Sequence, residues 1–521
     1  MPSRRGPPNR LTAAAAAALI EPGQTVVCAG FVGAGHAEAV TAALERRFLA
    51  CGQPTGLTLV YGAGQGDRAH RGVNHFGHAG LVRAVVGGHW ISAPKLGALV
   101  RDNAIEAWNL PQGVITHLFR AIAGGRAGVV TPIGLHTFVD PRHDGGRLTP
   151  RTPPGRVELV MLGGREQLFY PAFAVHVALI RATTADERGN LSTEHEPFHQ
   201  DLLAIAQAAH NSGGIVIAQV KRIVPAGTLD PNLVRVPGVL VDHLVVCEDP
   251  AEHWMTFGEE LNLAYTGAAP RDRSRPARAP LDARRIVQRR AFLELAALPD
   301  AVANLGVGMP AGIGAVAREE GWDRFTLTVE SGPVGGTPAD KLSFGASAHP
   351  EAIIDQAAMF DFYDGGGLDI AFLGLAEFDP LGNVNVSRFG DMVAGVGGFI
   401  NISQSTRRVV FLGTLTAGGL ALRSGDGRLA ILRDGHAKKL VPRVQHLSFN
   451  GPYVAGLGHQ VMFVTERAVF ELRSGRLTLI EVAPGMDIGR DVLAACGAAV
   501  AVADDLREMD PRIFTTDAAL P

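Results

Sequence analysis

Residues 25–50 read TVVCAGFVGAGHAEAVTAALERRFLA, an apolar β-type run followed by a glycine-rich turn and an alanine- and leucine-rich helical stretch. Similar units recur: LTLVYGAG at 57–64 reads as a strand that ends in glycines, and the helical DLLAIAQAAHNS at 201–212 precedes the apolar GGIVIAQV at 213–220. Nearly continuous apolar strands that alternate with helices are typical of parallel sheets covered by helices. We therefore predict an α/β fold with largely parallel sheets.

The two sides of the chain also resemble each other. Three pairs of segments match in the same order: VVCAGFVGAGHAEAV (26–40) with VANLGVGMPAGIGAV (302–316), LTLVYGAGQG (57–66) with TLTVESGPVGG (326–336), and HVALIRATTADERGNLS (176–192) with DIAFLGLAEFDPLGNVNVS (369–387). Three collinear matches predict two homologous open α/β domains. Between them, residues 266–285 are rich in Pro, Arg and Ala and read as a linker, which gives domains over 1–265 and 286–521.

Composition restricts the function classes. The 521 residues are 46% hydrophobic and 19% charged, with a formal net charge of −3, so no broad electrostatic field attracts nucleic acid or an anionic membrane. The four cysteines form no CxxC pair, as in a reduced cytoplasmic protein, and no 18-residue apolar run predicts a membrane span. At the N-terminus, we predict a short alanine helix capped by Thr12 and ended by Pro22 rather than a signal peptide.

One acid occupies an unexpected position in this pattern. Glu330 follows the apolar run FTLTV directly and precedes Ser331-Gly332. A carboxylate at the end of a buried strand is costly to desolvate unless it is paired or used, so it is a surface acid, an ion-pair partner or a nucleophile. The N-terminal copy has Tyr61 or Gly62 there and no acid, which favours chemistry carried by one half of the chain.

The residues around Glu330 resemble the family I coenzyme A transferases, in particular the single-chain acetate, propionate and acetoacetate type. The resemblance rests on VESGPVGG, FYDGGGLDIAFLGLAEFDPLGNVNVSRFG (362–390), GVGGFINISQ (395–404), NLPQGV (109–114) and ERAVFEL (466–472), and it extends over essentially the whole chain. It implies that two open α/β halves enclose the active site and that Glu330 is the nucleophile. An ionised carboxylate needs no general base, unlike a serine nucleophile.

The resemblance also implies roles for several glycine turns. Gly306-Val307-Gly308 and Gly397-Gly398 are expected to supply backbone N–H groups to the reaction oxyanion and to CoA. Gly33-Ala34-Gly35 and Gln112 are expected to line the acyl or carboxylate pocket. The implied partners are an acyl-CoA and a short-chain carboxylate, with coenzyme A as substrate, no tightly bound cofactor, and a homo-oligomer (dimer or tetramer).

Some alternatives remain at this stage. Ser331-Gly332 after the acid departs from the Glu-Asn-Gly of relatives that act on 3-oxoacids with succinyl-CoA, and so favours short monocarboxylates. A thioesterase, in which water resolves the enzyme intermediate, and a non-catalytic metabolite-binding regulator are the competing functions. Neither basic pair, Arg407-Arg408 or Lys438-Lys439, is singled out as a contact for the CoA phosphates.

Two motifs could suggest a dinucleotide loop and a metal site, but the sequence favours neither interpretation. Gly30, Gly33 and Gly35 have the spacing GxxGxG rather than the GxGxxG of dinucleotide loops, which favours a substrate-pocket turn. The histidines of AHRGVNHFGHAG and the nearby His89 lack a cysteine or carboxylate cluster in sequence that would complete a metal-ligand set, so no metal is predicted.

Overall fold

The computed structural model describes residues 6–270 and 276–520, and its chain forms two compact units. Unit 1 contains the chain up to Arg271 together with Val329–Asp361 and Gly390–Asn401, and unit 2 contains Asp272–Thr328, Phe362–Phe389 and Ile402–Pro521. Two segments from the second half of the sequence therefore pack within unit 1. Residues 271–275 of the predicted linker lie outside the described residues.

Unit 1 is built on a sheet with strand order β1-β15-β12-β9-β2-β3-β4-β5, in which every neighbouring pair is parallel. Its strands are β1 (Asn9–Leu11), β2 (Thr25–Cys28), β3 (Leu57–Tyr61), β4 (Val82–Gly87), β5 (Glu106–Asn109), β9 (Val177–Arg181), β12 (Ile215–Val220) and β15 (His243–Val246). Apart from Thr25, the side chains of β2, β3 and β9 are fully or almost fully buried, as expected for parallel strands covered on both faces.

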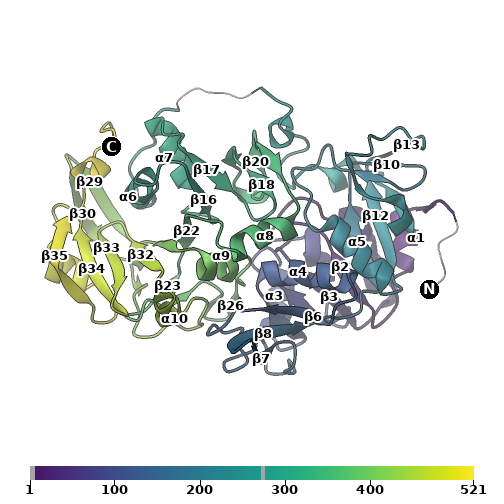
Figure 1. Cartoon of the computed structure of the whole chain (residues 1–521), viewed down its shortest axis with the longest axis horizontal. Helices are drawn as coiled ribbons and strands as arrows, with labels where there is room; N and C mark the ends of the chain where they lie inside the picture. Colours follow the sequence, from purple (N-terminus) through teal and green to yellow (C-terminus); the bar gives the residue numbers. More distant parts are fainter. Residues whose placement is uncertain (1–5, 271–275, 521) are drawn as a thin grey trace. The chain divides into compact units, whose positions relative to one another are not determined.

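Helices cover this sheet. α1 (Ala13–Ala18), α2 (Glu38–Cys51) and α3 (Pro94–Arg101) contribute to one hydrophobic core with the strands, whereas α4 (Gln112–Ala123) and α5 (Leu202–Asn211) pack against each other, side by side in Figure 1. The predicted N-terminal helix is confirmed, and its Thr12 side chain accepts a hydrogen bond from the Ala15 N–H at 3.2 Å.

Smaller sheets surround the unit 1 core. They comprise β6 (Gly128–Thr131), β7 (Glu158–Leu162) and β8 (Arg165–Pro171); β10 (Thr184–Asp186), β11 (Leu191–Ser192), β13 (Arg222–Val224) and β14 (Val234–Val236); and the pair β19 (Thr337–Pro338) with β20 (Ser347–Ala348). In addition, β18 (Pro333–Val334) pairs with β21 (Ala352–Ile353). The last two pairs belong to the segment 329–361, so this part of the second half forms its own strand pairs beside unit 1 residues.

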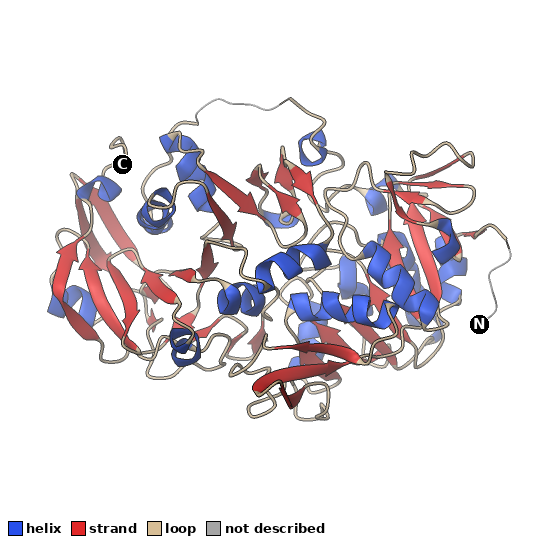
Figure 2. Ribbon diagram, viewed as in Figure 1, coloured by secondary structure: helices blue, strands red, loops and turns tan. Residues whose placement is uncertain are grey.

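Unit 2 has the strand order β17-β16-β22-β27-β32-β33-β34-β35. The strands are β16 (Ala301–Leu305), β17 (Phe325–Thr328), β22 (Ile370–Gly374), β27 (Arg408–Leu412), β32 (Gln460–Val464), β33 (Ala468–Arg473), β34 (Arg476–Val482) and β35 (Ala501–Glu508). From β17 to β32 all pairs are parallel, whereas β33 is antiparallel to both of its neighbours. Figure 2 shows these long C-terminal strands, and α6 (Ala283–Ala296) and α7 (Gly312–Glu320) pack together on the unit 2 core.

The predicted duplication is confirmed by topology. The order β15-β12-β9-β2-β3 in unit 1 matches β32-β27-β22-β16-β17 in unit 2, with parallel pairing throughout. The matching bends also agree in atomic detail: Asp186 accepts hydrogen bonds from Asn190 N and Nδ2, and Asp379 accepts them from Asn383 N and Nδ2. The α/β fold with largely parallel sheets is therefore confirmed.

No helix within residues 6–270 or 276–520 combines the length and apolar character that crossing a membrane requires.

Candidate active site

The candidate site gathers in unit 1, where loops leave the carboxyl ends of β2, β3, β4 and β5. Open parallel α/β sheets bind ligands at this edge because their strand-to-helix turns converge there. The loops after these strands carry Gly33–Gly35, Gly62–Gly64, His89 and Gln112. The segments 329–361 and 390–401 belong to the same unit and bring Glu330 and Gly397-Gly398 with them.

Glu330 lies two residues beyond the end of β17 and is buried, with 8% of its surface exposed. The residues around it are held on both sides. Val329 packs into an apolar cluster with Phe31, Ala34 and Ala63, and the Ser331 hydroxyl donates a hydrogen bond to the Gly345 carbonyl at 2.5 Å. The backbone that carries the carboxylate is therefore fixed beside the loop that follows β2.

The loop Gly33-Ala34-Gly35 is packed against its own protein chain. A Cβ on Gly33 would overlap the Leu342 carbonyl, and one on Gly35 would overlap the side-chain amide of Gln200. Ala34 belongs to the same apolar cluster as Val329. The role of this loop as a substrate-pocket turn stays a prediction. The glycines are required by close approach rather than by a nucleotide.

Gln112 and Gly397 are brought into direct contact. The Gln112 N–H donates to the Gly397 carbonyl at 2.9 Å, and Gln112 is 2% exposed at the first position of α4. The Gly397 N–H donates to the Gly88 carbonyl at 2.7 Å, so it is already used within the protein. For the Gly398 N–H, which precedes α9 (Phe399–Ser405), no acceptor is found among residues 6–270 and 276–520. Of the two predicted donors, Gly398 is the one that this geometry leaves available.

Two residues at the ends of β4 and β5, which sequence reasoning did not select, hold this turn in place. Buried Asn109 donates to the carbonyls of Gly87 and Gly88 and accepts a hydrogen bond from the Val396 N–H at 3.1 Å. His89 lies against Gly64 and Gly397, and burial lowers its pKa to about 4, with the nearby Arg68 charge as a lesser cause. Asn109 opens the NLPQGV motif, so its place in that motif was the available signal.

A buried polar network adjoins Gln112. Its side-chain Nε2 donates to Gln356 Oε1 at 3.3 Å, Gln356 Nε2 donates to Asp201 Oδ2 at 2.8 Å, and the Thr116 hydroxyl contacts Asp201 Oδ1. Burial raises the Asp201 pKa to about 7, with the neighbouring Asp355 as a lesser cause. Nothing in the sequence pointed to this network, because Asp201 and Gln356 are 155 positions apart.

The network also connects to the Glu330 segment through the backbone. The Ile354 N–H donates to the Gly332 carbonyl at 3.0 Å, and Gln356 follows two residues later with its N–H on the Gln200 carbonyl at 3.1 Å. Hydrogen bonds and apolar contacts therefore connect four predicted site segments within unit 1: Glu330, Gly33–Gly35, Gln112 and Gly397-Gly398.

The predicted turn Gly306-Val307-Gly308 lies in unit 2. It follows β16, Gly308 has a left-handed φ of +87°, and Val307 is 56% exposed. The Gly306 N–H already donates to the Phe372 carbonyl at 2.8 Å, whereas Val307 and Gly308 lie on an open turn. The role of this turn toward the oxyanion stays a prediction.

The histidine-rich segment forms an ion-pair network. His75 contacts Glu45 through Nδ1 and Glu38 through Nε2, and His78 contacts Glu45 at 2.6 Å. Lys95 adds a contact to Glu45 at 3.1 Å. These contacts account for both ring nitrogens of His75 and give this segment a structural role in linking α2 to the loop before β4.

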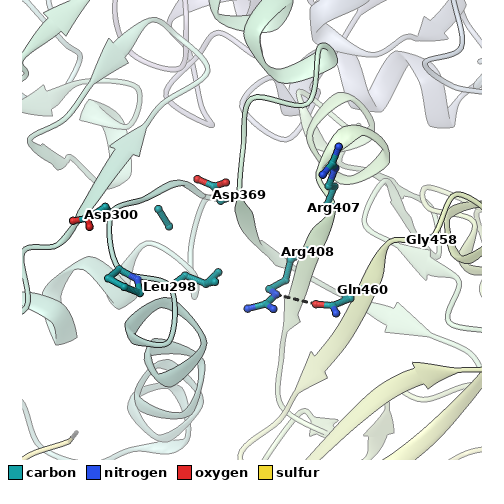
Figure 3. Close-up of a pocket in the computed structure, with 9 residues that line it drawn as sticks. Leu298, Asp300, Asp369, Arg407, Arg408, Gly458 and Gln460 are labelled. Carbon is teal, nitrogen blue, oxygen red and sulfur yellow. Dashed lines mark hydrogen bonds between the residues drawn. The ribbon is translucent and has the colours of Figure 1, made fainter.

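The basic pair Arg407-Arg408 lines a cavity of about 440 Å³ in unit 2, at the amino ends of β16, β22, β27 and β32. Figure 3 shows Arg408 bound to Gln460 and Arg407 directed away from Asp300. Ligands of parallel sheets usually bind at the carboxyl ends. Lys438 is bound to the carbonyls of Ala494 and Cys496. These contacts do not identify either basic pair as a binding site for the CoA phosphates.

The chain is similar to known coenzyme A transferases. The family profile described as Coenzyme A transferase matches residues 10–247. The caffeate CoA-transferase of Acetobacterium woodii is 43% identical over 97% of both chains, and the acetate CoA-transferase YdiF of Escherichia coli O157:H7 is 42% identical over 96% of this chain and 94% of its own. A crystal structure of the O157:H7 enzyme as a thioester complex with CoA superposes with a TM-score of 0.92 at 40% identity, covering 98% of this chain and 97% of the other.

Proposed function

The chain belongs to the coenzyme A transferase family and is a CoA-transferase, and from that premise we propose that it moves CoA between a short-chain acyl-CoA and a free carboxylate through Glu330. The observation that carries the proposal is the gathering of Glu330, Gly33–Gly35, Gln112 and Gly398 in one unit at the carboxyl ends of parallel strands.

The proposed reaction is ping-pong. The Glu330 carboxylate attacks the thioester carbonyl, which forms a mixed anhydride and releases CoA thiolate. The thiolate attacks the glutamyl carbonyl, so a glutamyl-CoA thioester forms and the first acid leaves. A second carboxylate then attacks this thioester and reverses the two steps, so that the new acyl-CoA leaves and the glutamate is regenerated. Each step exchanges one acyl bond for another and needs no oxidant or added proton.

The oxyanion formed in each attack needs preorganised donors. In this proposal the Gly398 N–H supplies one donor from the turn that Asn109 and Gln112 hold, and a lost donor in such a site costs about 3–4 kcal/mol of transition-state stabilisation. Burial of Glu330 excludes water from the reacting carboxylate, and this favours transfer over hydrolysis. The fixed backbone around Ser331 keeps the nucleophile from relaxing away from the thioester.

The proposal also specifies the size of the acyl group. The two relatives of equal similarity are named for acetate and for caffeate, acids of very different size, so acyl size must depend on local pocket residues rather than on the shared fold. We assign short monocarboxylates because Ser331-Gly332 follows the acid. Coenzyme A enters as a substrate, and the cytoplasmic location and homo-oligomeric state stay predictions.

The decisive experiment traps the intermediate. The protein is incubated with an acyl-CoA, reduced with borohydride and digested, and the peptides are measured by mass spectrometry. Modification confined to the peptide with Glu330, absent from a Glu330→Ala variant, supports the proposal. No adduct, together with full transfer by that variant, overturns it.

A thioesterase is distinguished by its products. The rate of acyl-CoA loss is measured with and without an acceptor acid, and the new acyl-CoA is quantified. Transfer requires that consumption depends on the acceptor and that one acyl-CoA appears for each one lost. Consumption that is independent of the acceptor and yields only free CoA would establish hydrolysis instead.

A further inference from the structure

Gln200 combines several features that packing alone does not explain. It lies just before α5, is 3% exposed, and has a left-handed backbone with φ of +55°. An unbranched side chain rarely adopts this conformation, and such residues persist where the surroundings impose them, often at functional sites. The carbonyl of Gln200 receives the Gln356 N–H at 3.1 Å, which helps to hold the backbone in this state.

The side chain of Gln200 is directed at the predicted acyl pocket. Its Nε2 occupies the space beside the Gly35 Cα, where a Cβ would overlap it. Phe198, two residues earlier, packs in the apolar cluster that contains Val329. His199 lines a cavity of about 450 Å³ together with Arg235 and other residues. The segment 198–200 therefore lies between the apolar cluster next to Glu330, the cavity lined by His199 and the Gly33–Gly35 loop.

The amide oxygen of Gln200 is buried, and among the residues that the structure describes it has no hydrogen-bond partner. Buried polar atoms are nearly always bonded, and an acceptor left alone loses the hydrogen bonds that water would give it. An acceptor kept in this state beside a substrate loop is suited to a donor that arrives with the substrate. The donor must be an O–H or N–H group, because a keto oxygen or a carboxylate offers no hydrogen.

We propose that Gln200 is a specificity-determining residue that accepts a hydrogen bond from a hydroxyl group on the acyl chain, so that the enzyme favours hydroxylated short acyl groups. The inference rests on the proposed function, in which Gly33–Gly35 line the acyl pocket. An apolar acyl group leaves Oε1 without a partner, whereas a hydroxyacyl group satisfies it. The amide N–H groups of the pantetheine arm of CoA offer the same chemistry, and the test below separates the two sources.

The test compares Gln200→Met with the wild-type enzyme. Met has a similar length and the same difficulty with a left-handed backbone, but its thioether sulfur is only a weak hydrogen-bond acceptor. Gln207→Met, further along α5 and away from these contacts, is the matched control. The substrates are butyryl-CoA, 3-hydroxybutyryl-CoA, acetoacetyl-CoA, propionyl-CoA and lactoyl-CoA with one acceptor acid.

The expected result is a loss of preference. In Gln200→Met, kcat/KM for the hydroxyacyl substrates falls roughly tenfold relative to their unsubstituted partners, and Gln207→Met leaves the ratios unchanged. Acetoacetyl-CoA follows butyryl-CoA because its keto group donates no hydrogen bond. An equal fall for all five substrates assigns the contact to pantetheine and overturns the proposal, as do unchanged ratios.

A binding measurement makes this test independent of turnover. The thermal shift of the wild-type protein is recorded with 3-hydroxybutyrate and with butyrate, and again for Gln200→Met. A larger shift with the hydroxy acid that disappears in the variant supports the role of Gln200 even if no CoA transfer is observed. Equal shifts in the wild-type protein contradict it. Failure of transfer with a selective shift would indicate instead that the proposed function is wrong.

Discussion

The two copies of the duplicated unit differ at the position that the proposed chemistry uses. In the second copy, the strand β17 leads into Glu330, whereas in the first copy β3 leads into Gly62. The sequence left Tyr61 and Gly62 as possible counterparts of the acid. The hydrogen-bond register of the two sheets selects Gly62.

The register is fixed by equivalent bonds. Ala29 N–H donates to the Leu179 carbonyl in one copy, and Gly306 N–H donates to the Phe372 carbonyl in the other. Ala29 and Gly306 are therefore equivalent, and so are the residues two positions earlier in each strand. Val27 of the first copy is thus equivalent to Asn304 of the second. Val27 pairs with Val60 and Asn304 pairs with Thr328, so Val60 is equivalent to Thr328. Two residues later, Gly62 is therefore equivalent to Glu330.

A single residue, Gly62 in the first copy and Glu330 in the second, separates the copy without the acid from the copy with the candidate nucleophile. A Cβ on Gly62 would lie 3.5 Å from Gln356 Nε2 and 3.7 Å from Asp201 Oδ2, which is ordinary contact. The first copy therefore leaves a small space beside a buried amide and a buried acid, whereas the second copy fills the same position with a carboxylate. The strands, their order and the Asp-Asn bends are shared. The second copy alone carries the candidate nucleophile at this position.

The largest expected effect comes from removing that difference. Glu330→Gln keeps the side-chain shape but removes the nucleophilic carboxylate, and kcat/KM for CoA transfer should fall by at least roughly 10³-fold. Steady-state transfer assays measure this loss, and circular dichroism checks the fold. Glu158→Gln, on β7 and exposed, serves as the control. If Glu330→Gln retains a tenth of the wild-type rate, the two copies do not differ in the way proposed.

The shared bends should respond alike. Asp186→Ala and Asp379→Ala each remove a buried carboxylate that caps a turn through two backbone N–H groups and an Asn side chain. Each substitution should lower the free energy of unfolding by about 2–3 kcal/mol. Urea unfolding measures the loss. A marked effect in one copy with none in the other would show that the bends have diverged in energy despite their matching Asp-Asn hydrogen bonds.

Asp201, beside the glycine counterpart, should make stability depend on pH. Burial raises its pKa to about 7 in the folded protein, above the usual value of 3.8, so the folded state keeps a proton that the unfolded chain releases. Its contribution to stability therefore declines as pH rises from about 4 to about 7, by up to about 1.4 kcal/mol per pH unit. Below this window both states are protonated and the group contributes no slope.

Asp201→Asn tests this dependence because the amide mimics the protonated acid toward Thr116 and Gln356. Urea midpoints measured between pH 4.5 and 7.5 should show a flatter profile in the variant than in the wild-type protein. Asp230→Asn, an exposed acid elsewhere in unit 1, should leave the wild-type slope intact. An equal pH dependence of stability in the wild-type protein and in Asp201→Asn would contradict the prediction.

The smallest effect concerns the residue next to Gly62. Tyr61 is fully buried, and its hydroxyl has no hydrogen-bond partner in the described part of the chain. Tyr61→Phe should therefore stabilise the protein by about 0.5–1 kcal/mol and leave transfer unchanged. Tyr170→Phe is the opposite case, because the Tyr170 hydroxyl donates to the Ile133 carbonyl at 2.8 Å, and it should destabilise. Differential scanning calorimetry resolves the two signs, and destabilisation in both variants would refute the prediction.

Local patterns in the sequence predicted much of the architecture. Apolar β runs, helix starts such as Thr12 and the matched segments around Gly189-Asn190 and Gly382-Asn383 depend on neighbouring residues, so they are readable along the chain. Glu330 stood out for the same reason, since an acid directly after an apolar run violates a local rule. The glycine spacing of the GFVGAG turn likewise predicts a substrate-pocket turn, and this stays a prediction.

Long-range contacts explain what could not be predicted. Gln356 meets Asp201 and Gln112 only after the segment 329–361 has packed within unit 1, and no periodicity marks such a meeting. The pair Gly397-Gly398 looked like two equivalent donors, but the Gly88 carbonyl takes one of the N–H groups. Partners of this kind depend on backbone placement rather than on residue type.

By itself the sequence determined an α/β duplication, its parallel strands and the single acid that distinguishes the copies, because each of these follows from side-chain burial and turn chemistry within short windows. The fold was needed to show that Gly62 rather than Tyr61 is the counterpart of that acid, that the Gly398 N–H can still donate a hydrogen bond, and which buried polar residues lie beside Gln112. These features depend on the register of the sheets and on the packing of Val329–Asp361 and Gly390–Asn401 within unit 1. Both depend on packing free energy summed over the whole core.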